Sequence, residues 1–292
     1  MSLVPAVGLR RALVLAAPLL LTACGVTQSG SSADGPHVVG SFYPLAYVAE
    51  RVAGDQGEVT NLTTPGVEPH DLELNVRQVA AVADADVVVY EKDMQPAVDE
   101  AVAQNGPDHV VEAGQTVGLE GQDPHFWLDP ARMADLGVAV KRELVKVDPD
   151  HAGVYERNLT SLKRDLDSVD KAYRQGLADC TIDTVVVSHD AFEYLQKYGL
   201  RFEPIAGLTP DAEPSAAHLK QIGDVAREDH ITTVFYETLA SPALARTLAR
   251  DLGVKAAVLD PIEGLGRTTS DQDYLSLMRK NLQELRSANR CR

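Results

Sequence analysis

The centre of the chain carries a 28-residue stretch without proline, DHAGVYERNLTSLKRDLDSVDKAYRQGL, which runs from Asp150 to Leu177. Its apolar residues recur close to the helical period, at Val154, Leu159, Leu162, Leu166, Val169 and Tyr173. Pro149 supplies a start signal and Gly176 lies near a stop. At 1.5 Å per residue such a helix would be about 42 Å long, enough to cross a small domain. We therefore expect one stiff helix in the middle of the chain.

On both sides of this helix, short apolar runs alternate with amphipathic segments. Eight runs are predicted to be strands: 37–41, 58–63, 86–90, 109–112, 184–187, 202–206, 232–236 and 254–259. Alternating strands and helices indicate parallel sheets that are covered on both faces. The predicted fold class is therefore α/β, with two lobes, each a parallel sheet of about four strands flanked by helices, joined by the single long helix.

This organisation divides the chain into five segments. We expect a signal peptide, a lipid-anchored flexible tether, an N-terminal α/β lobe, the linking helix and a C-terminal α/β lobe, at residues 1–23, 24–36, 37–147, 148–179 and 180–292.

The first segment has the features of an export signal. Arg10 and Arg11 precede an apolar run over 12–21, which is too short to span a membrane but fits the apolar region of a signal peptide. Leu21-Thr22-Ala23-Cys24 resembles the bacterial lipobox, in which the signal is cut before the cysteine and a lipid is attached to its sulfur. A chance cysteine after an ordinary signal peptide is the alternative. We expect an exported protein that Cys24 anchors at the outer face of the cell membrane.

Composition limits the classes of partner. The chain has 292 residues, 43 Asp and Glu against 27 Lys and Arg, and a formal net charge of −16. With 45% hydrophobic and 24% charged residues it is neither disordered, collagenous nor a multi-span membrane protein. The negative charge argues against nucleic acid as a partner, since phosphate binding needs clustered Lys and Arg. A cation is the more natural ligand.

Two further cysteines, Cys180 and Cys291, remain in the body of the chain. In an exported protein an even pair favours a disulfide, with two unpaired thiols as the alternative. The bond would connect the C-terminus to the start of the second lobe.

Four potential metal ligands follow predicted strands or their loops: His70, His125, His189 and Asp260. In open α/β sheets, ligands bind in the crevice beyond the carboxyl ends of the strands. Imidazole nitrogens with one carboxylate suit Zn²⁺ in a tetrahedral site. Because each lobe supplies two of the four, we expect the metal in the cleft between the lobes.

Two other carboxylates lie near these positions. Glu68, two residues before His70, could replace Asp260 as the fourth ligand, as could a water molecule. Glu237 closes a predicted strand and is expected to orient a histidine rather than to bind the metal. The remaining histidines fit solvated or capping positions: His37, His109, His151, His218 and His230.

Five motifs carry a family resemblance: VGSFYPL at 39–45, EPHD at 68–71, PHFWLDP at 124–130, SHDAFEYL at 188–195 and LDP at 259–261. Together they resemble the zinc-specific solute-binding lipoproteins of bacterial ABC transporters, the ZnuA-like group of the metal-binding periplasmic proteins. The resemblance covers residues 37–291. It implies a long backbone helix, a metal between two lobes, His70, His125 and His189 as ligands, and Asp260 as the usual fourth.

The resemblance also implies a function. Such a protein captures Zn²⁺ outside the cytoplasm and delivers it to an ABC permease, so it is a receptor and not an enzyme. We expect a monomer held at the membrane by its lipid anchor, with zinc and the permease as partners and a metal chaperone as a further candidate. Many zinc-binding members have a long His-rich loop before the second ligand, but here only His109 lies between Tyr90 and His125. In those members the loop is thought to collect or deliver metal, so here this role is either absent or carried out by a partner.

Three alternatives remain at this stage. A manganese receptor of the same fold usually has a carboxylate at the third position, whereas His189 favours zinc. An exported zinc hydrolase would need an open fourth position, and the chain lacks the His-Glu-x-x-His and Gly-x-Ser-x-Gly motifs. A surface adhesin is the third, although no sequence repeat argues for it.

Overall fold

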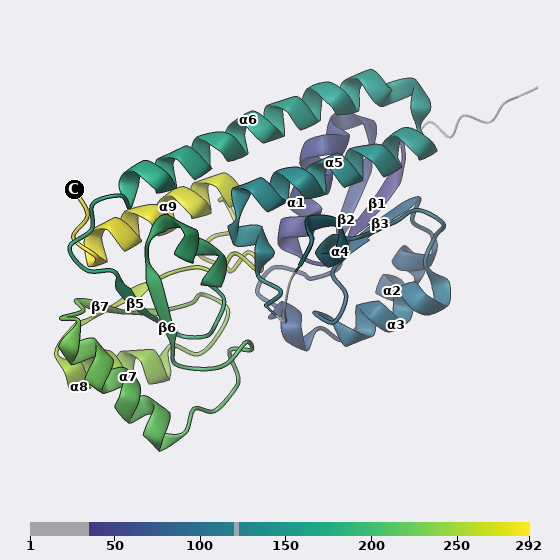
Figure 1. Ribbon diagram of the computed structural model, residues 1–292. Helices are drawn as coiled ribbons and strands as arrows, with labels where there is room; N and C mark the ends of the chain where they lie inside the picture. Colours follow the sequence, from purple (N-terminus) through teal and green to yellow (C-terminus); the bar gives the residue numbers. More distant parts are fainter. Residues whose placement is uncertain (1–34, 120–122) are drawn as a thin grey trace, which may run out of the picture. The chain divides into compact units, whose positions relative to one another are not determined.

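The computed structural model describes residues 35–119 and 123–292, and these ranges contain two four-stranded parallel sheets (Figure 1). The first has the order β2-β1-β3-β4, built from His37–Gly40 (β1), Glu58–Asn61 (β2), Val87–Tyr90 (β3) and Val110–Glu112 (β4). The second has the order β6-β5-β7-β8, built from Thr184–Val187 (β5), Arg201–Pro204 (β6), Thr233–Tyr236 (β7) and Lys255–Val258 (β8). The eight predicted strands and the α/β class are confirmed. The predicted signal peptide and Cys24 lie outside the described residues.

Both sheets repeat one topology. The first strand of each set lies next to the third, with Val38 paired to Val87 in one sheet and Val186 to Val234 in the other. The chain therefore moves outward on one side of β1 to β2 and then crosses to the other side for β3, and it does the same around β5. The crevice at such a switch point is where α/β sheets bind ligands.

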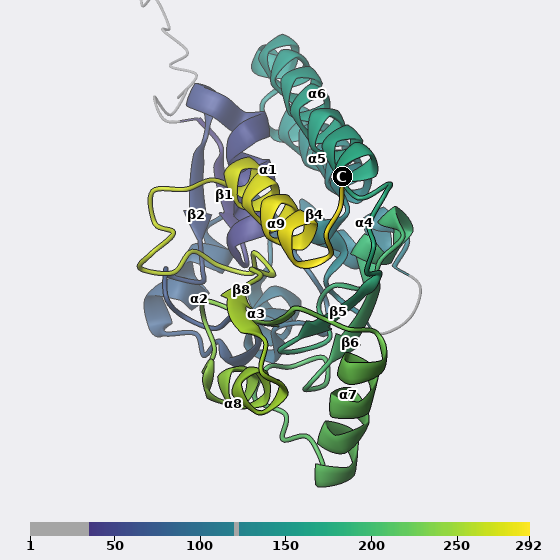
Figure 2. The ribbon, with the colours of Figure 1, turned by 90° about the vertical axis from the view of Figure 1, so that its left-hand side faces the viewer.

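The long linking helix is present as α6 (Ala152–Gly176), preceded by a single 3-10 turn at Pro149–His151. Five of the six residues of the predicted apolar stripe are buried: Leu159, Leu162, Leu166, Val169 and Tyr173. The sixth, Val154, is only half-buried, and Tyr155 is buried in the first turn instead. On the first half of the chain α6 packs against α1 (Tyr43–Ala53) and α5 (Pro130–Val147), and on the second against α9 (Tyr274–Ala288) (Figure 2). One helix thus contacts elements from both halves.

Helices cover both faces of each sheet. Alternate residues of a strand point to opposite faces, so Val38 belongs to the core that includes α1, α5 and α6, while Val39 belongs to the core that includes α2 (Val76–Ala83) and α3 (Pro96–Asn105). In the second sheet Val186 belongs to a core with α7 (Ala216–Glu228) and α8 (Ala243–Leu252). Val185 and Val187, on the opposite face, belong to the core that includes α9. A short helix, α4 (Ala113–Val117), follows β4. No helix within residues 35–119 or 123–292 is long and apolar enough to cross a membrane.

One apolar core joins the two sheets. It includes Val87 and Trp127 from the first half together with Val185 and Tyr274 from the second. The hydroxyl of Tyr274 donates a hydrogen bond of 2.6 Å to the carbonyl of Trp127. The described residues belong to one compact unit, so the two sheets and the loops between them have a defined arrangement.

The predicted disulfide is confirmed. Cys180 and Cys291, 111 residues apart in sequence, are bonded. Backbone hydrogen bonds lie on both sides of it, from Thr181 N–H to Asn289 at 3.1 Å and from Arg292 N–H to Asp179 at 3.0 Å. The end of the chain is therefore fixed next to the start of the second half.

Candidate metal centre

Four side chains converge where the loops of the two sheets meet: His70, His125, His189 and Glu263. One potential ligand atom from each lies within 4.8 Å of the other three. The structure thus brings together the three histidines that the sequence singled out. The carboxylate beside them is Glu263, which the sequence analysis missed.

Three of the four residues, His70, His189 and Glu263, lie in the loops that follow β2, β5 and β8, and His125 comes after β4 and the short helix α4. His70 lies in the 3-10 turn Pro69–Asp71, and its backbone N–H donates a hydrogen bond to the side chain of Glu68. His125 directly precedes the 3-10 turn Phe126–Leu128. His189 comes two residues after β5, and Glu263 comes five residues after β8. This is the carboxyl edge of the parallel strands, as expected for an α/β ligand site.

The spacing of the ligand atoms fits a small tetrahedral ion. Oε1 of Glu263 lies 3.2 Å from Nε2 of His125, 3.2 Å from Nε2 of His189 and 3.8 Å from Nε2 of His70. In a tetrahedral zinc site with bonds of about 2.0–2.1 Å, neighbouring ligand atoms are about 3.3–3.4 Å apart. Small side-chain movements would place all four atoms around one Zn²⁺.

The cluster is enclosed by protein. The side chains of His125, His189 and Glu263 are fully buried, and that of His70 is 9% exposed. Nε2 of His70, Nε2 of His125 and Oε2 of Glu263 have no hydrogen-bond partner in the described part of the chain. Buried polar atoms without partners are costly, and a metal ion at their centre would satisfy them.

Two further carboxylates hold the rings of the buried histidines. Oδ1 of Asp123 lies 2.6 Å from Nδ1 of His125 and also accepts that residue's backbone N–H. Oε1 of Glu237 lies 3.0 Å from Nδ1 of His189. Both contacts leave Nε2 facing Glu263, which is how metal-binding imidazoles are oriented in proteins. Glu237 occupies the orienting position expected from sequence. Asp123 was not predicted, although its place two residues before His125 was a usable signal.

Electrostatics in the metal-free cluster favour protonated imidazoles. Burial lowers the pKa of His189, but its contacts with Glu237 and Glu263 outweigh burial and raise the pKa to about 10. The pKa of His125 is raised against burial in the same way by Asp123 and Glu263. Burial alone would raise the pKa of Glu263, yet the three histidines hold it well below its ordinary value. Protons thus compete with any metal for the histidine nitrogens.

Glu68 is near the cluster but is not one of the four. One of its oxygens accepts the backbone N–H of His70 at 3.2 Å, and the other is buried without a partner. Burial, helped by the charge of Glu263, raises the pKa of Glu68 to about 8. Glu68 therefore caps the turn that carries His70.

Contrary to expectation, the structure does not bring Asp260 into this group. Its Oδ1 accepts the backbone N–H of Ile262 at 2.8 Å, and its Oδ2 accepts the hydroxyl of Thr238 at 3.0 Å. The chain then turns at Ile262, whose φ is 61°, and this turn directs Glu263 to the histidines. A β-branched residue in the left-handed conformation is strained by about 1–3 kcal/mol, so local sequence preferences do not predict this turn.

The geometry has a counterpart in a known family. The model of the family described as "ZnuA: Zinc-uptake complex component A periplasmic" matches residues 38–288 of this chain. The chain belongs to this ZnuA family. The resemblance inferred from the five sequence motifs is confirmed, and membership places the chain among solute-binding components of zinc-uptake systems.

Individual ZnuA relatives cover nearly all of the chain. The high-affinity zinc uptake system protein ZnuA of Bacillus subtilis is 33% identical over 299 residues, covering 92% of this chain and 94% of that protein. The Zn(II)-bound ZnuA-like domain of Streptococcus pneumoniae AdcA is 35% identical with a TM-score of 0.75, covering 87% of this chain and 99% of the domain. This chain spans 58% of full-length pneumococcal AdcA. The laminin-binding protein Lmb of Streptococcus agalactiae is 31% identical with a TM-score of 0.80, covering 87% of this chain and 99% of the Lmb chain.

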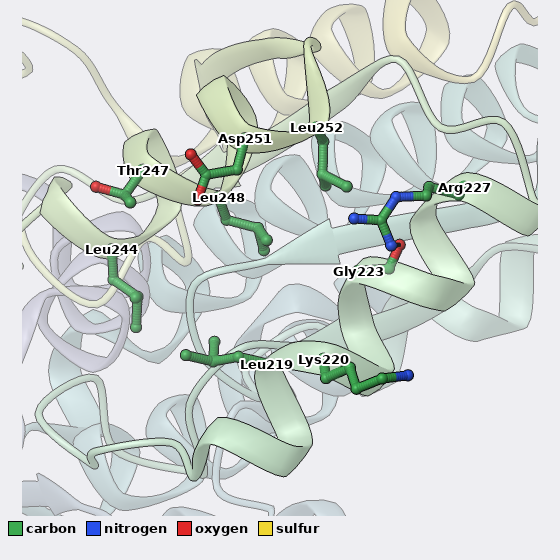
Figure 3. Close-up of a pocket in the computed structure, with 9 residues that line it drawn as sticks. All are labelled: Leu219, Lys220, Gly223, Arg227, Leu244, Thr247, Leu248, Asp251 and Leu252. Atoms are coloured by element: carbon green, nitrogen blue, oxygen red, sulfur yellow. Dashed lines mark hydrogen bonds between the residues drawn. The ribbon is translucent and has the colours of Figure 1, made fainter.

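A separate hollow of about 250 Å³ lies between α7 and α8 (Figure 3). It is lined by leucines of both helices, with Lys220, Arg227 and Asp251 at its edges. None of the four clustered residues lines it. The hollow is therefore distinct from the candidate metal centre.

Proposed function

We propose that this protein is the extracytoplasmic receptor of a zinc-importing ABC transporter, which binds Zn²⁺ at His70, His125, His189 and Glu263 and delivers it to the permease. The observation that carries the proposal is the enclosed group of three imidazoles and one carboxylate, whose potential ligand atoms all lie within 4.8 Å of one another. Membership of the ZnuA family and the zinc-uptake role of the Bacillus subtilis relative support it.

The donor set favours zinc over manganese. Imidazole nitrogens suit Zn²⁺, whereas Mn²⁺ prefers carboxylate and carbonyl oxygens. Three of the four donors here are imidazoles, and the fully buried His189 is one of them.

The same donor set argues against a zinc hydrolase. Catalytic zinc sites keep one coordination position for water or substrate, while four protein ligands close a tetrahedral site. A closed and reversible site suits capture and release, so the protein acts as a receptor and not as an enzyme.

Attachment and assembly complete the proposal. Lipidation of Cys24, which lies outside the described residues, would hold the receptor at the outer face of the cell membrane through the tether. We propose that it acts as a monomer with lobes at 37–147 and 180–292 joined by the helical segment 148–179. A metal chaperone could take the place of the long His-rich loop.

A chelator-competition titration with Zn²⁺ and Mn²⁺ tests the function. We expect one Zn²⁺ per chain with nanomolar or tighter affinity and much weaker Mn²⁺ binding. His189→Asn should weaken zinc binding by roughly 100-fold or more, because it removes a buried ligand. His230→Asn, the same change at an exposed histidine outside the cluster, should have no effect. Tighter Mn²⁺ binding, or full zinc affinity in His189→Asn, would contradict the proposal.

A further inference from the structure

We propose that Asp260 is a positioning residue for Glu263: it holds the turn that aims the Glu263 carboxylate at the three histidines. The inference rests on the proposed zinc site. It gives the Leu259-Asp260-Pro261 motif a role other than metal ligation.

The turn at Ile262 requires stabilising contacts from other parts of the chain. Ile262 has a φ of 61° and its side chain is fully buried. A β-branched residue in this left-handed conformation is an outlier, and it persists only where the surroundings over-determine it. Because Ile262 directly precedes Glu263, its backbone conformation decides where the carboxylate lies.

The peptide unit between Pro261 and Ile262 is held from both sides. Its carbonyl oxygen accepts a hydrogen bond of 2.7 Å from the indole Nε1 of Trp127. Its N–H donates a hydrogen bond of 2.8 Å to Oδ1 of Asp260. These two contacts fix the orientation of the peptide plane and with it the direction in which the chain enters Glu263.

Asp260 is itself anchored firmly enough to act as a support. Its backbone N–H donates to Oδ1 of Asn281 at 3.0 Å, and its carbonyl accepts from Nδ2 of Asn281 at 2.6 Å. Asn281 is a buried residue of α9, and Thr238 occupies the second carboxylate oxygen of Asp260. Both carboxylate oxygens of Asp260 thus accept a hydrogen bond within the protein, and neither belongs to the group of clustered ligand atoms. Its contacts therefore favour a support over a ligand.

Substitutions at Asp260 separate the two roles. Asn keeps an oxygen that can accept the N–H of Ile262 but removes the negative charge, whereas Ala removes both. We expect Asp260→Ala to weaken zinc binding by about 10–100-fold, as is usual when a contact to a metal ligand is lost. Asp260→Asn should stay within about fivefold of the unaltered protein and leave the absorption spectrum of the Co²⁺-substituted site unchanged. The zinc affinity of Glu263→Gln, measured in the same way, shows how much binding is lost when a charged ligand is neutralised.

A second pair of variants tests the turn itself. Glycine accepts a positive φ without strain, while alanine does not. In the Asp260→Ala background, Ile262→Gly should therefore recover more zinc affinity than Ile262→Ala, although both remove the isoleucine side chain beyond Cβ. Thermal unfolding of each metal-free variant separates a change in the site from a change in the fold.

The outcomes are distinct. Loss of affinity in Asp260→Asn equal to that in Glu263→Gln, or full affinity in Asp260→Ala, would overturn the positioning role while the unaltered protein still binds zinc. Should Asp260→Ala fail to fold, the comparison of Asp260→Asn with Glu263→Gln still decides. Absence of tight zinc binding in the unaltered protein would overturn the proposed function, and this inference with it.

Discussion

The indole Nε1 of Trp127 donates a hydrogen bond of 2.7 Å to the carbonyl oxygen of Pro261, which lies 134 residues further along the chain. Trp127 is two residues after His125, and Pro261 is two residues before Glu263. The bond therefore joins the loops that carry a ligand from each half of the chain. One contact thus connects the two halves of the chain close to two residues of the metal centre.

Trp127→Phe should weaken both the fold and the site. The substitution leaves the buried carbonyl of Pro261 without a donor, which we expect to lower the free energy of unfolding by about 1–3 kcal/mol. Denaturant unfolding of the metal-free protein measures this loss, and a chelator titration should show weaker zinc binding. Tyr274→Phe is the matched control, because it removes the 2.6 Å hydrogen bond to Trp127 but leaves Pro261 paired. Equal zinc affinities in the two variants would argue against a link between Pro261 and the site.

The sequence predicted the features that follow from periodicity and strand ends. The strands alternate with helices, and His189 directly follows a buried run, so the carboxyl-edge rule located it. The helix over Pro130–Val147 also had a helical apolar pattern, at Met133, Leu136, Val140 and Leu144, and was overlooked.

The fourth donor could not be predicted in the same way. The rule for strand ends favours the first acid after β8, which is Asp260, whereas the structure uses Glu263 three residues later. The difference arises from the positive φ of Ile262, a conformation that local propensity disfavours and that long-range contacts impose. Trp127 and Asn281, which help to impose it, are distant in sequence and carry no local signal.

Zinc binding should weaken as the pH falls. Against the effect of burial, contacts with Glu237 and Glu263 raise the pKa of His189 to about 10, so at neutral pH this ring carries a proton that zinc must displace. The pKa of His125 is raised against burial as well, by Asp123 and Glu263, which favours the protonated form of that ring. Lowering the pH makes that displacement harder, and we expect at least a roughly tenfold loss of affinity between pH 7 and about 5.5. Competition titrations across this range give the slope, and calorimetry in buffers of different ionisation enthalpy gives the protons released. A flat profile would be incompatible with the three-imidazole site.

Glu68→Gln should stabilise the metal-free protein at alkaline pH. The folded pKa of Glu68 is raised to about 8, above its ordinary value, so its contribution to stability is present at low pH and is lost as the pH rises through about 8. Glutamine keeps the acceptor for the N–H of His70 and cannot ionise. The melting temperatures of Glu68→Gln and the unaltered protein should therefore be equal near pH 4.5. At pH 9 the variant should have the higher melting temperature. Glu73→Gln, at an exposed site nearby, should show no such difference, and a lower melting temperature for Glu68→Gln would refute the burial argument.

Removing the disulfide should lower stability while sparing the metal centre. The bond closes a separation of 111 residues, and the chain-entropy treatment gives about 4–5 kcal/mol for a loop of that order, with about 2–5 kcal/mol usual for native bonds. We expect the double variant Cys180→Ser with Cys291→Ser to lose stability in this range in denaturant unfolding. The bonded pair connects the segment after α6 to the end of α9, whereas the ligands lie beyond the strands. Zinc affinity should therefore remain within about threefold of the unaltered protein under conditions where both are folded. A large loss of zinc affinity with little loss of stability would mean that the end of the chain controls the site, and the separation of fold from site would have to be abandoned.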